Sequence, residues 1–268
     1  MTDAADSTAA AHPRSLPTEV DTVLQEDDRL ELGAVQRLRV HVARGQVDVI
    51  GRDEPGATVE AHEAARPLPV RLDDGVLRIG STDALALGGK AVLTITVQRD
   101  AAVEVDGTSA SVLISGMKQG LLVRTVSGDV VGDATAGTAR LEGVSAELAL
   151  REHEGRVDVT TISGAATVSG AVTRLEHTGV SGEVFLDLEA PDRVEVRTVS
   201  GPVVLRLGRD RSADYAVDTV SGEVQLDGAE RPKRPGGVRG RWDGPGEPTA
   251  VRVSTSSGSV RIVHAEET

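Results

Sequence analysis

The chain has 268 residues and contains no cysteine, which excludes a disulfide framework and thiol chemistry. Its only aromatic residues are Phe185, Tyr215 and Trp242, so Val, Leu, Ile and Ala must fill the core. No apolar run reaches the length of a transmembrane helix, and the first residues contain no apolar core of a signal peptide. We therefore expect a cytoplasmic protein without membrane insertion.

Positive charge is in the minority, with 29 lysine and arginine residues against 42 aspartate and glutamate residues. The formal net charge is −13, and the acidic residues are spread along the chain. Binding to phosphate backbones requires a basic surface, so we expect no nucleic-acid partner. Helix signals are weak as well, because the many glycines and β-branched residues favour turns and strands. The composition predicts an all-β protein.

A serine recurs at a nearly constant interval along most of the chain. The first steps are eighteen residues long, and the later ones are nineteen and twenty-one; the serines are Ser109, Ser127, Ser145, Ser163, Ser181, Ser200 and Ser221. Each lies in a variant of the string T-V-S-G. A fixed period near twenty residues is typical of a solenoid, in which each unit buries its apolar face against its neighbours.

Alternating apolar residues before each serine indicate a strand with one buried face, as at Leu121 and Val123. The alternation changes after the glycine, which predicts a corner where a small residue is needed. At this corner we expect Val126 in the core and Asp129 in solvent. The predicted corner residues are Ser127, Gly128, Ser163, Gly164, Ser181, Gly182, Ser200, Gly201, Ser221 and Gly222.

These features predict a right-handed parallel β-solenoid with turns of about 18 residues. Such a turn has a contour of roughly 60 Å, enough for two or three short strands, and parallel crossovers are nearly always right-handed. We expect one solenoid domain after a polar tail. The predicted parts are a disordered acidic tail (1–34) and a β-solenoid (35–264), with irregular first turns (35–102), regular repeats (103–228), an insertion loop (229–250) and a last turn (251–264).

The repeats carry a family resemblance. The T-V-S-G-[DE]-V units, which follow the opening LRVHVARGQVDVIG, resemble the bacterial β-strand-repeat domain of unknown function known as the putative adhesin family. The resemblance covers residues 35–264, and it implies a β-solenoid without known catalysis. Bactofilins, which are cytoskeletal polymers, are similar in architecture only.

The recurring serines invite comparison with a catalytic nucleophile. Catalysis needs one activated serine beside a histidine and a carboxylate, whereas a ladder of hydroxyls at a corner explains the repetition. The six histidines show no spacing typical of a zinc site, and we expect no metal or cofactor. His177 occupies a column of apolar residues, so it is either a hydrogen-bonded core histidine or a sign that the chain bends outward.

The segment 229–250 combines the only tryptophan with the densest basic cluster. It is a possible partner-binding loop formed by Arg234, Arg239, Arg241 and Trp242, although the tryptophan could equally cover an edge of the core. We predict a non-enzymatic scaffold or protein-interaction module, which could self-associate. The alternative is an adhesin or envelope-associated binding protein. A carbohydrate-active β-helix enzyme is less favoured, because aromatic platforms for sugar are missing.

Overall fold

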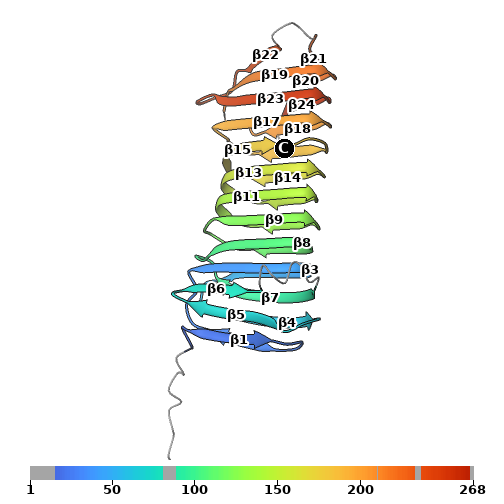
Figure 1. Ribbon diagram of the computed structural model, residues 1–268. Coiled ribbons are helices and arrows are strands. Elements are labelled where there is room, and N and C mark those ends of the chain that lie inside the picture. The colour runs from blue at the N-terminus through green and yellow to red at the C-terminus, as the bar shows by residue number, and fades with distance from the viewer. Residues whose placement is uncertain (1–15, 81–88, 210, 233–236, 266–268) are drawn as a thin grey trace, which may run out of the picture.

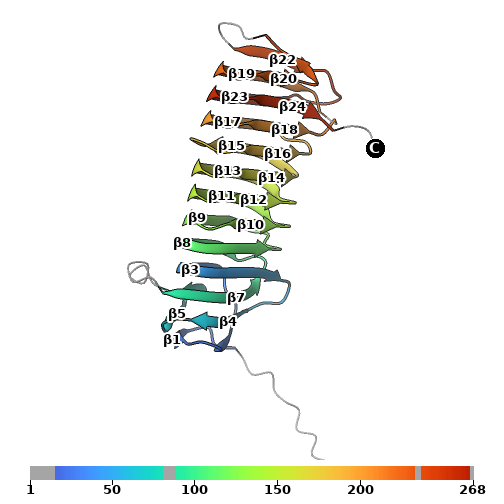
Figure 2. The same ribbon diagram turned by 90° about the vertical axis from the view of Figure 1, so that its right-hand side faces the viewer.

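The computed structural model describes residues 16–80, 89–209, 211–232 and 237–265. These residues form an all-β protein in which 24 strands belong to one hydrogen-bonded, mostly parallel sheet. The strands stack into an elongated body with two columns that run side by side (Figure 1). The view from the side shows the same stack, with the N-terminal and C-terminal parts at opposite ends (Figure 2).

Each repeat contributes one strand to each column, and we call such a pair a level. The first column contains, in spatial order, β1 (Val20–Leu24), β5 (Leu68–Asp73), β6 (Val76–Ile79), β3 (Arg37–Arg52), β8 (Ala102–Ser115), β9 (Leu121–Ser127), β11 (Ala136–Ser145), β13 (Glu154–Ser163), β15 (Val172–Thr178), β17 (Arg193–Ser200), β23 (Thr249–Ser257), β19 (Ala213–Ser221) and β22 (Val238–Trp242).

The long strands β3 and β8 run through both columns. The other strands of the second column are β2 (Arg29–Leu32), β4 (Ala57–Ala64), β7 (Lys90–Gln98), β10 (Val130–Asp133), β12 (Leu148–Arg151), β14 (Ala166–Gly170), β16 (Val184–Leu188), β18 (Val203–Leu207), β24 (Val260–His264), β20 (Val224–Leu226) and β21 (Ala229–Glu230).

The register of the central levels follows the serine period. Leu121 pairs with Ala139 and Ala139 pairs with Val157, each step spanning 18 residues. Buried Val, Leu, Ile and Ala from both columns form one continuous core. Leu121 and Val123 are buried, so these two predicted inward positions before the corner are confirmed, and Val130 is buried after the corner.

The predicted position of Val126 is wrong. Its side chain is 48% exposed, whereas Thr125 is buried beside it. The Thr125 hydroxyl donates a hydrogen bond to the Ser127 carbonyl at 3.0 Å, which satisfies a polar group inside the corner. Because neighbouring residues of a strand point to opposite faces, an inward Thr125 turns Val126 towards solvent. Asp129 is exposed, as predicted.

The C-terminal part corrects two predictions. Residues 251–264 are not the end of the stack, because β23 lies between β17 and β19 and β24 lies between β18 and β20. The segment 229–250 is not only a loop, since β21 and β22 pair antiparallel with β20 and β19. These antiparallel strands cover the edges that would otherwise end the stack exposed.

The N-terminal part corrects a third prediction. The disordered tail predicted for residues 1–34 is wrong for β1 and β2, which pair antiparallel with β5 and β4. Leu24 and Leu32 are buried in the core, which anchors these otherwise polar strands. Residues 1–15 lie outside the described part of the chain. Among the described residues, no helix is long and apolar enough to cross a membrane.

Candidate functional site

The recurring serines lie at the corner between the two columns. Their hydroxyls donate hydrogen bonds of 3.2–3.3 Å to backbone carbonyls of the neighbouring level. Ser127 Oγ also lies 3.0 Å from Ser109 Oγ. The serines with these backbone bonds are Ser127, Ser163, Ser181, Ser200 and Ser221. These hydroxyls are therefore engaged in hydrogen bonds to the backbone of the neighbouring level.

The glycine after each of these serines adopts a positive φ, between 110° and 134°. A Cβ atom at these positions would lie only 2.0–2.5 Å from a carbonyl oxygen of the neighbouring level. Both observations explain why a side chain does not fit there. The glycines are Gly128, Gly164, Gly182, Gly201 and Gly222.

Two levels replace the glycine by alanine and compensate nearby. Ala110 and Ala146 are buried, and the column that elsewhere holds the inward threonine contains Gly107 and Gly143. A Cβ on Gly143 would lie 3.1 Å from the Ala146 Cβ. One small side chain therefore occupies the space of the missing threonine, and the packing of the core is kept.

His177 lies in the core column of the first strands. Its side chain is 3% exposed, and it pairs in register with Val159 and Val196. Neither ring nitrogen has a hydrogen-bond partner among the residues that the structure describes. Gly179 makes room for the ring, because a Cβ there would lie 2.8 Å from His177 Cε1. His177 is therefore a core histidine and not a sign that the chain bends outward, but it lacks the expected hydrogen bond within the described part of the chain.

The burial of His177 predicts a dependence of stability on pH. Burial lowers its pKa from 6.5 to about 4. Above pH 6.5 the ring is neutral in both states. Below that pH the unfolded chain binds a proton that the folded chain does not, so stability falls as the pH drops towards 4. Between pH 7 and pH 5 we expect His177 to cost about 2 kcal/mol of unfolding free energy.

Urea denaturation of the wild type and of His177→Val at both pH values measures this effect. We expect the wild type to lose about 2 kcal/mol more than the variant. His62→Gln is the control, because His62 is exposed. An equal loss in wild type and His177→Val would contradict the assignment. Burial also lowers the pKa of His153, so we expect part of the loss to remain in the variant.

His153 is buried at the turn that follows the second column. Its Nδ1 lies 2.9 Å from Thr135 Oγ1, and its Nε2 lies 3.2 Å from the Gly137 carbonyl oxygen. Both ring nitrogens therefore have partners. Within the described residues, no three His, Asp or Glu side chains gather closely enough to hold a metal ion.

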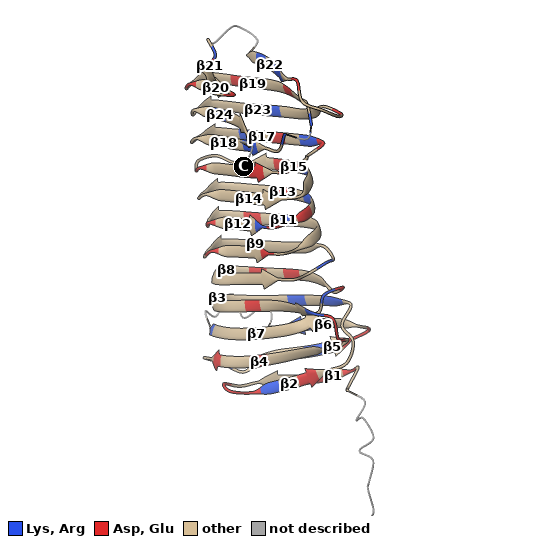
Figure 3. Ribbon diagram, turned by 180° about the vertical axis from the view of Figure 1, so that it is seen from behind, with Lys and Arg blue, Asp and Glu red and all other residues tan. Residues whose placement is uncertain are grey.

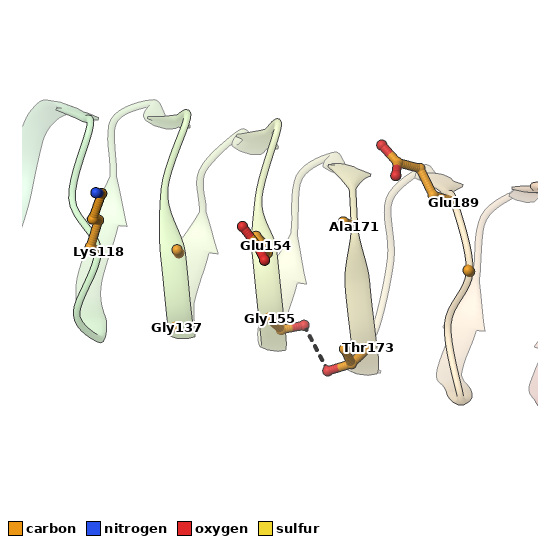
Figure 4. A pocket seen from close by; sticks show the side chains of 9 residues that line it. Lys118, Gly137, Glu154, Gly155, Ala171, Thr173 and Glu189 are labelled. Atoms are coloured by element: carbon orange, nitrogen blue, oxygen red, sulfur yellow. Dashed lines mark hydrogen bonds between the residues drawn. The ribbon is translucent and has the colours of Figure 1, made fainter.

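An open groove of about 620 Å³ runs across successive levels near Lys118, Glu154 and Glu189 (Figure 4). Its floor contains Gly155, whose added Cβ would lie 2.2 Å from a carbonyl oxygen. The Thr173 hydroxyl donates to the Gly155 carbonyl at 3.2 Å. Close approach of neighbouring backbones therefore explains the small residues that form the groove. Thr173 carries the one hydroxyl among the described lining residues, and the backbone engages it.

The predicted partner-binding loop is mostly tied to the body. Trp242 stacks on His264 with ring centroids 4.2 Å apart, and His264 Nδ1 lies 2.7 Å from Asp227 Oδ1. Arg241 lies 3.0 Å from Asp243, and Arg239 is exposed. Arg234 lies outside the described residues. Trp242 packs against the core edge at this end, and a role of the loop in partner binding stays a prediction.

Charged side chains on the outer face of the first column are mostly paired. Acidic and basic residues are mixed along the stack (Figure 3). Arg174 Nη2 lies 2.7 Å from Glu176, and Arg193 Nη2 lies 2.7 Å from Glu195. Arg197 also contacts Glu195, and these arginines lower the pKa of that carboxyl. The arginines on this face are therefore largely neutralised by neighbouring carboxylates.

The most unusual surface is a line of exposed apolar side chains on the first column, directly before the serines. We call it the apolar ladder. It accounts for six of the eleven large hydrophobic residues that are exposed in the described part of the chain. Its members are between 38% and 81% exposed: Val126, Val144, Ile162, Val180, Val199 and Val220.

The sequence contained a signal for this ladder. Thr125 and Val126 are adjacent, and only one of two adjacent residues on a regular strand can face inward. At four levels the threonine is the buried member of this adjacent pair: Thr125, Thr161, Thr198 and Thr255. The apolar column is therefore left on the outside.

Comparisons with known proteins find a distant likeness among solved structures. No family model matches the chain, and no curated protein matches it either. Among solved structures, the chain is similar to a "putative cell adhesion protein" from Clostridium sporogenes, with 12% sequence identity and a TM-score of 0.26. The match covers 93% of this chain and 100% of the other. The family resemblance of the repeats therefore stays a prediction.

Proposed function

We propose that this protein is a non-enzymatic scaffold that binds protein partners through the apolar ladder. The observation that carries the proposal is the repetition of one exposed aliphatic side chain per level. Val126, Val144, Ile162, Val180 and Val199 occupy five consecutive levels. Contiguous exposed apolar patches on soluble proteins commonly mark interaction sites.

The fold itself does not require apolar residues in this column. Thr108 and Ser256 occupy the same position at two other levels, and both are exposed. Polar side chains are therefore compatible with the corner. Binding of another surface gives a reason for the aliphatic side chains, because burial of apolar area is the main favourable term in association.

Other features of the chain support binding over catalysis. The serine hydroxyls are engaged by the backbone, and both nitrogens of His153 are occupied. Paired arginines on the first column also offer little free positive charge for nucleic acid. We propose no cofactor and no metal. No contact among the described residues favours the adhesin or the carbohydrate-enzyme alternative.

We also propose that the stack is a right-handed parallel β-solenoid with 18-residue turns. The register step of 18 residues between successive levels supports the turn length. The handedness rests on the strong preference of parallel crossover connections for the right-handed form. One rigid solenoid presents the ladder as a straight surface, which suits a scaffold.

Photo-crosslinking tests the proposed function. A benzophenone amino acid is placed at Ile162 in the ladder, and at Phe185 as a matched control on the second column, because Phe185 is also exposed. In the cells that make the protein, we expect discrete covalent adducts from position 162. These adducts should disappear when Val144 and Val180 are both changed to lysine. Equal adduct patterns at both positions would contradict the proposal.

A further inference from the structure

We infer that the apolar ladder binds a second copy of this chain, with the two stacks side by side and antiparallel. This inference rests on the proposed function, because it names the partner of the same surface. The two copies would be related by a two-fold axis that is perpendicular to the stack and passes between the levels of Ile162 and Val180.

The spacing of the ladder favours a partner with the same repeat. Consecutive levels lie about 4.8 Å apart, so the five consecutive side chains from Val126 to Val199 span about 19 Å. A surface with another spacing would meet only some of these side chains in register. A second copy matches the spacing at every level, because an isologous interface uses the same patch on both chains.

The two-fold axis places complementary side chains opposite each other. Val144 faces Val199 of the second copy, and Ile162 faces Val180 of the second copy. The residue two positions earlier on each strand lies beside the ladder on the same outer face. Glu142 therefore faces Arg197 of the second copy, and symmetry repeats this pair.

Both charged side chains are available for this contact. The Glu142 side chain is 31% exposed, and the Arg197 side chain is 58% exposed. Glu142 already contacts Arg140 at 2.6 Å, and Arg197 already contacts Glu195. A carboxylate can accept several hydrogen bonds at once, and a guanidinium has five N–H donors, so each group can add a second partner. The pair sets orientation and register, which is the usual contribution of charges at an interface.

The other flank, beyond the corner, adds no repulsion in this arrangement. Glu147 faces Pro202 of the second copy, and Ala165 faces Glu183 of the second copy. A two-fold axis parallel to the stack would instead bring the two flanks of the ladder together. Glu142 would then face Glu147 of the second copy, and this repulsion would offset the attraction between Arg124 and Asp129 of the second copy. Arg197 would face Pro202 of the second copy and lose its acidic partner, so this arrangement gains no net attraction. The charge pattern thus selects the antiparallel arrangement.

Like charges also limit the length of the contact. At its two ends Asp106 would face Asp218 of the second copy, outside the consecutive part of the ladder. Asp106 accepts a hydrogen bond from Arg124 at 3.1 Å within its own chain, which reduces this repulsion. The proposed interface is therefore centred on the levels from Val144 to Val199, and Val126 faces Ser256 of the second copy.

Engineered cysteines test the arrangement directly, because the natural chain has none. Val144→Cys and Val199→Cys proteins are purified separately, mixed in equal amounts and exposed to oxidised glutathione. A disulfide requires Cβ atoms about 4 Å apart, so we expect a covalent dimer that contains one copy of each variant. A dimer of Val144→Cys with itself would overturn the antiparallel arrangement.

Sedimentation equilibrium tests the association without new covalent bonds. We expect the wild type to be a dimer and Ile162→Lys to be a monomer of unchanged melting temperature. Glu142→Arg or Arg197→Glu should each raise the dimer dissociation constant by about tenfold or more. The double variant with both reversals should recover dimerisation. Failure of this recovery, or a wild type that stays monomeric at 200 µM, would overturn the inference.

The two tests separate the inference from the proposed function. A monomeric wild type whose position 162 still forms ladder-dependent adducts with another protein overturns self-association and leaves the scaffold function standing. A monomeric wild type without such adducts overturns both. Phe185→Lys is the control variant in sedimentation, because it removes an exposed apolar side chain from the other column, and it should remain dimeric.

Discussion

Val123→Asp is expected to destabilise the fold by about 4 kcal/mol or more, so that little folded protein is recovered. Val123 is 0% exposed and pairs in register with Val105 and Leu141 of the neighbouring levels. A carboxylate at this position would lie between apolar side chains without a hydrogen-bond partner. Burial of an unpaired charge is among the most destabilising single changes known.

The matched variant Val126→Asp is expected to change the unfolding free energy by less than about 1 kcal/mol. Val126 lies three residues further along the same strand and is 48% exposed, so its charge stays in water. Urea denaturation at low protein concentration measures both variants as monomers. Val123→Ala, which should cost about 2 kcal/mol, gives a measurable value if the aspartate variant does not fold. Equal effects of aspartate at 123 and 126 would contradict the inward and outward assignment.

Much of the central stack could be predicted from the sequence. The alternation at Leu121 and Val123 and the glycine at position 128 each reflect a local requirement of one strand or one corner. Val126 was misplaced, because valine has the same strand preference on either face. Its direction depends on Thr125, whose buried hydroxyl finds an acceptor only in the folded corner.

The two ends could not be predicted in the same way. Ser221 and Ser257 are 36 residues apart, which reads as two periods along the chain. In space they are direct neighbours, and Ser257 also pairs with Ser200. β23 lies between two strands that precede it in the sequence, and a linear repeat contains no information about such an order in space. The antiparallel strands β1 and β2 are short and mostly polar, so their pattern resembled a tail.

The candidate surface could not be predicted either, because it also depends on the arrangement of the levels in space. Trp242 was a candidate for partner binding because it is the only tryptophan, yet it stacks on His264 and covers a core edge. The apolar ladder was hidden within the predicted core and became visible only when the corner geometry was known. A repeat protein can thus place its contact surface inside the most regular part of its repeat, where each level adds one equivalent side chain.

Gly182→Ala is expected to cost about 3 kcal/mol or more, although it adds only one methyl group. Gly182 has a φ of 134°, a region that residues with a Cβ rarely adopt. The added Cβ would lie 2.0 Å from the Gly164 carbonyl oxygen. Relief of this clash requires neighbouring levels to move apart, and Gly201 packs against Gly182 in the same way. The damage therefore spreads along the stack.

Two control variants isolate this cause. Gly89→Ala should leave stability within about 0.5 kcal/mol of the wild type, because a Cβ there meets no atom of the described residues within 4 Å. Ser181→Ala removes the 3.3 Å hydrogen bond to the Ile162 carbonyl and should cost only about 1 kcal/mol. Thermal and urea denaturation of the three variants should rank Gly182→Ala far below the others. A Gly182→Ala protein as stable as Gly89→Ala would mean that the corner relaxes freely. Close stacking of the T-V-S-G units would then not hold the levels together.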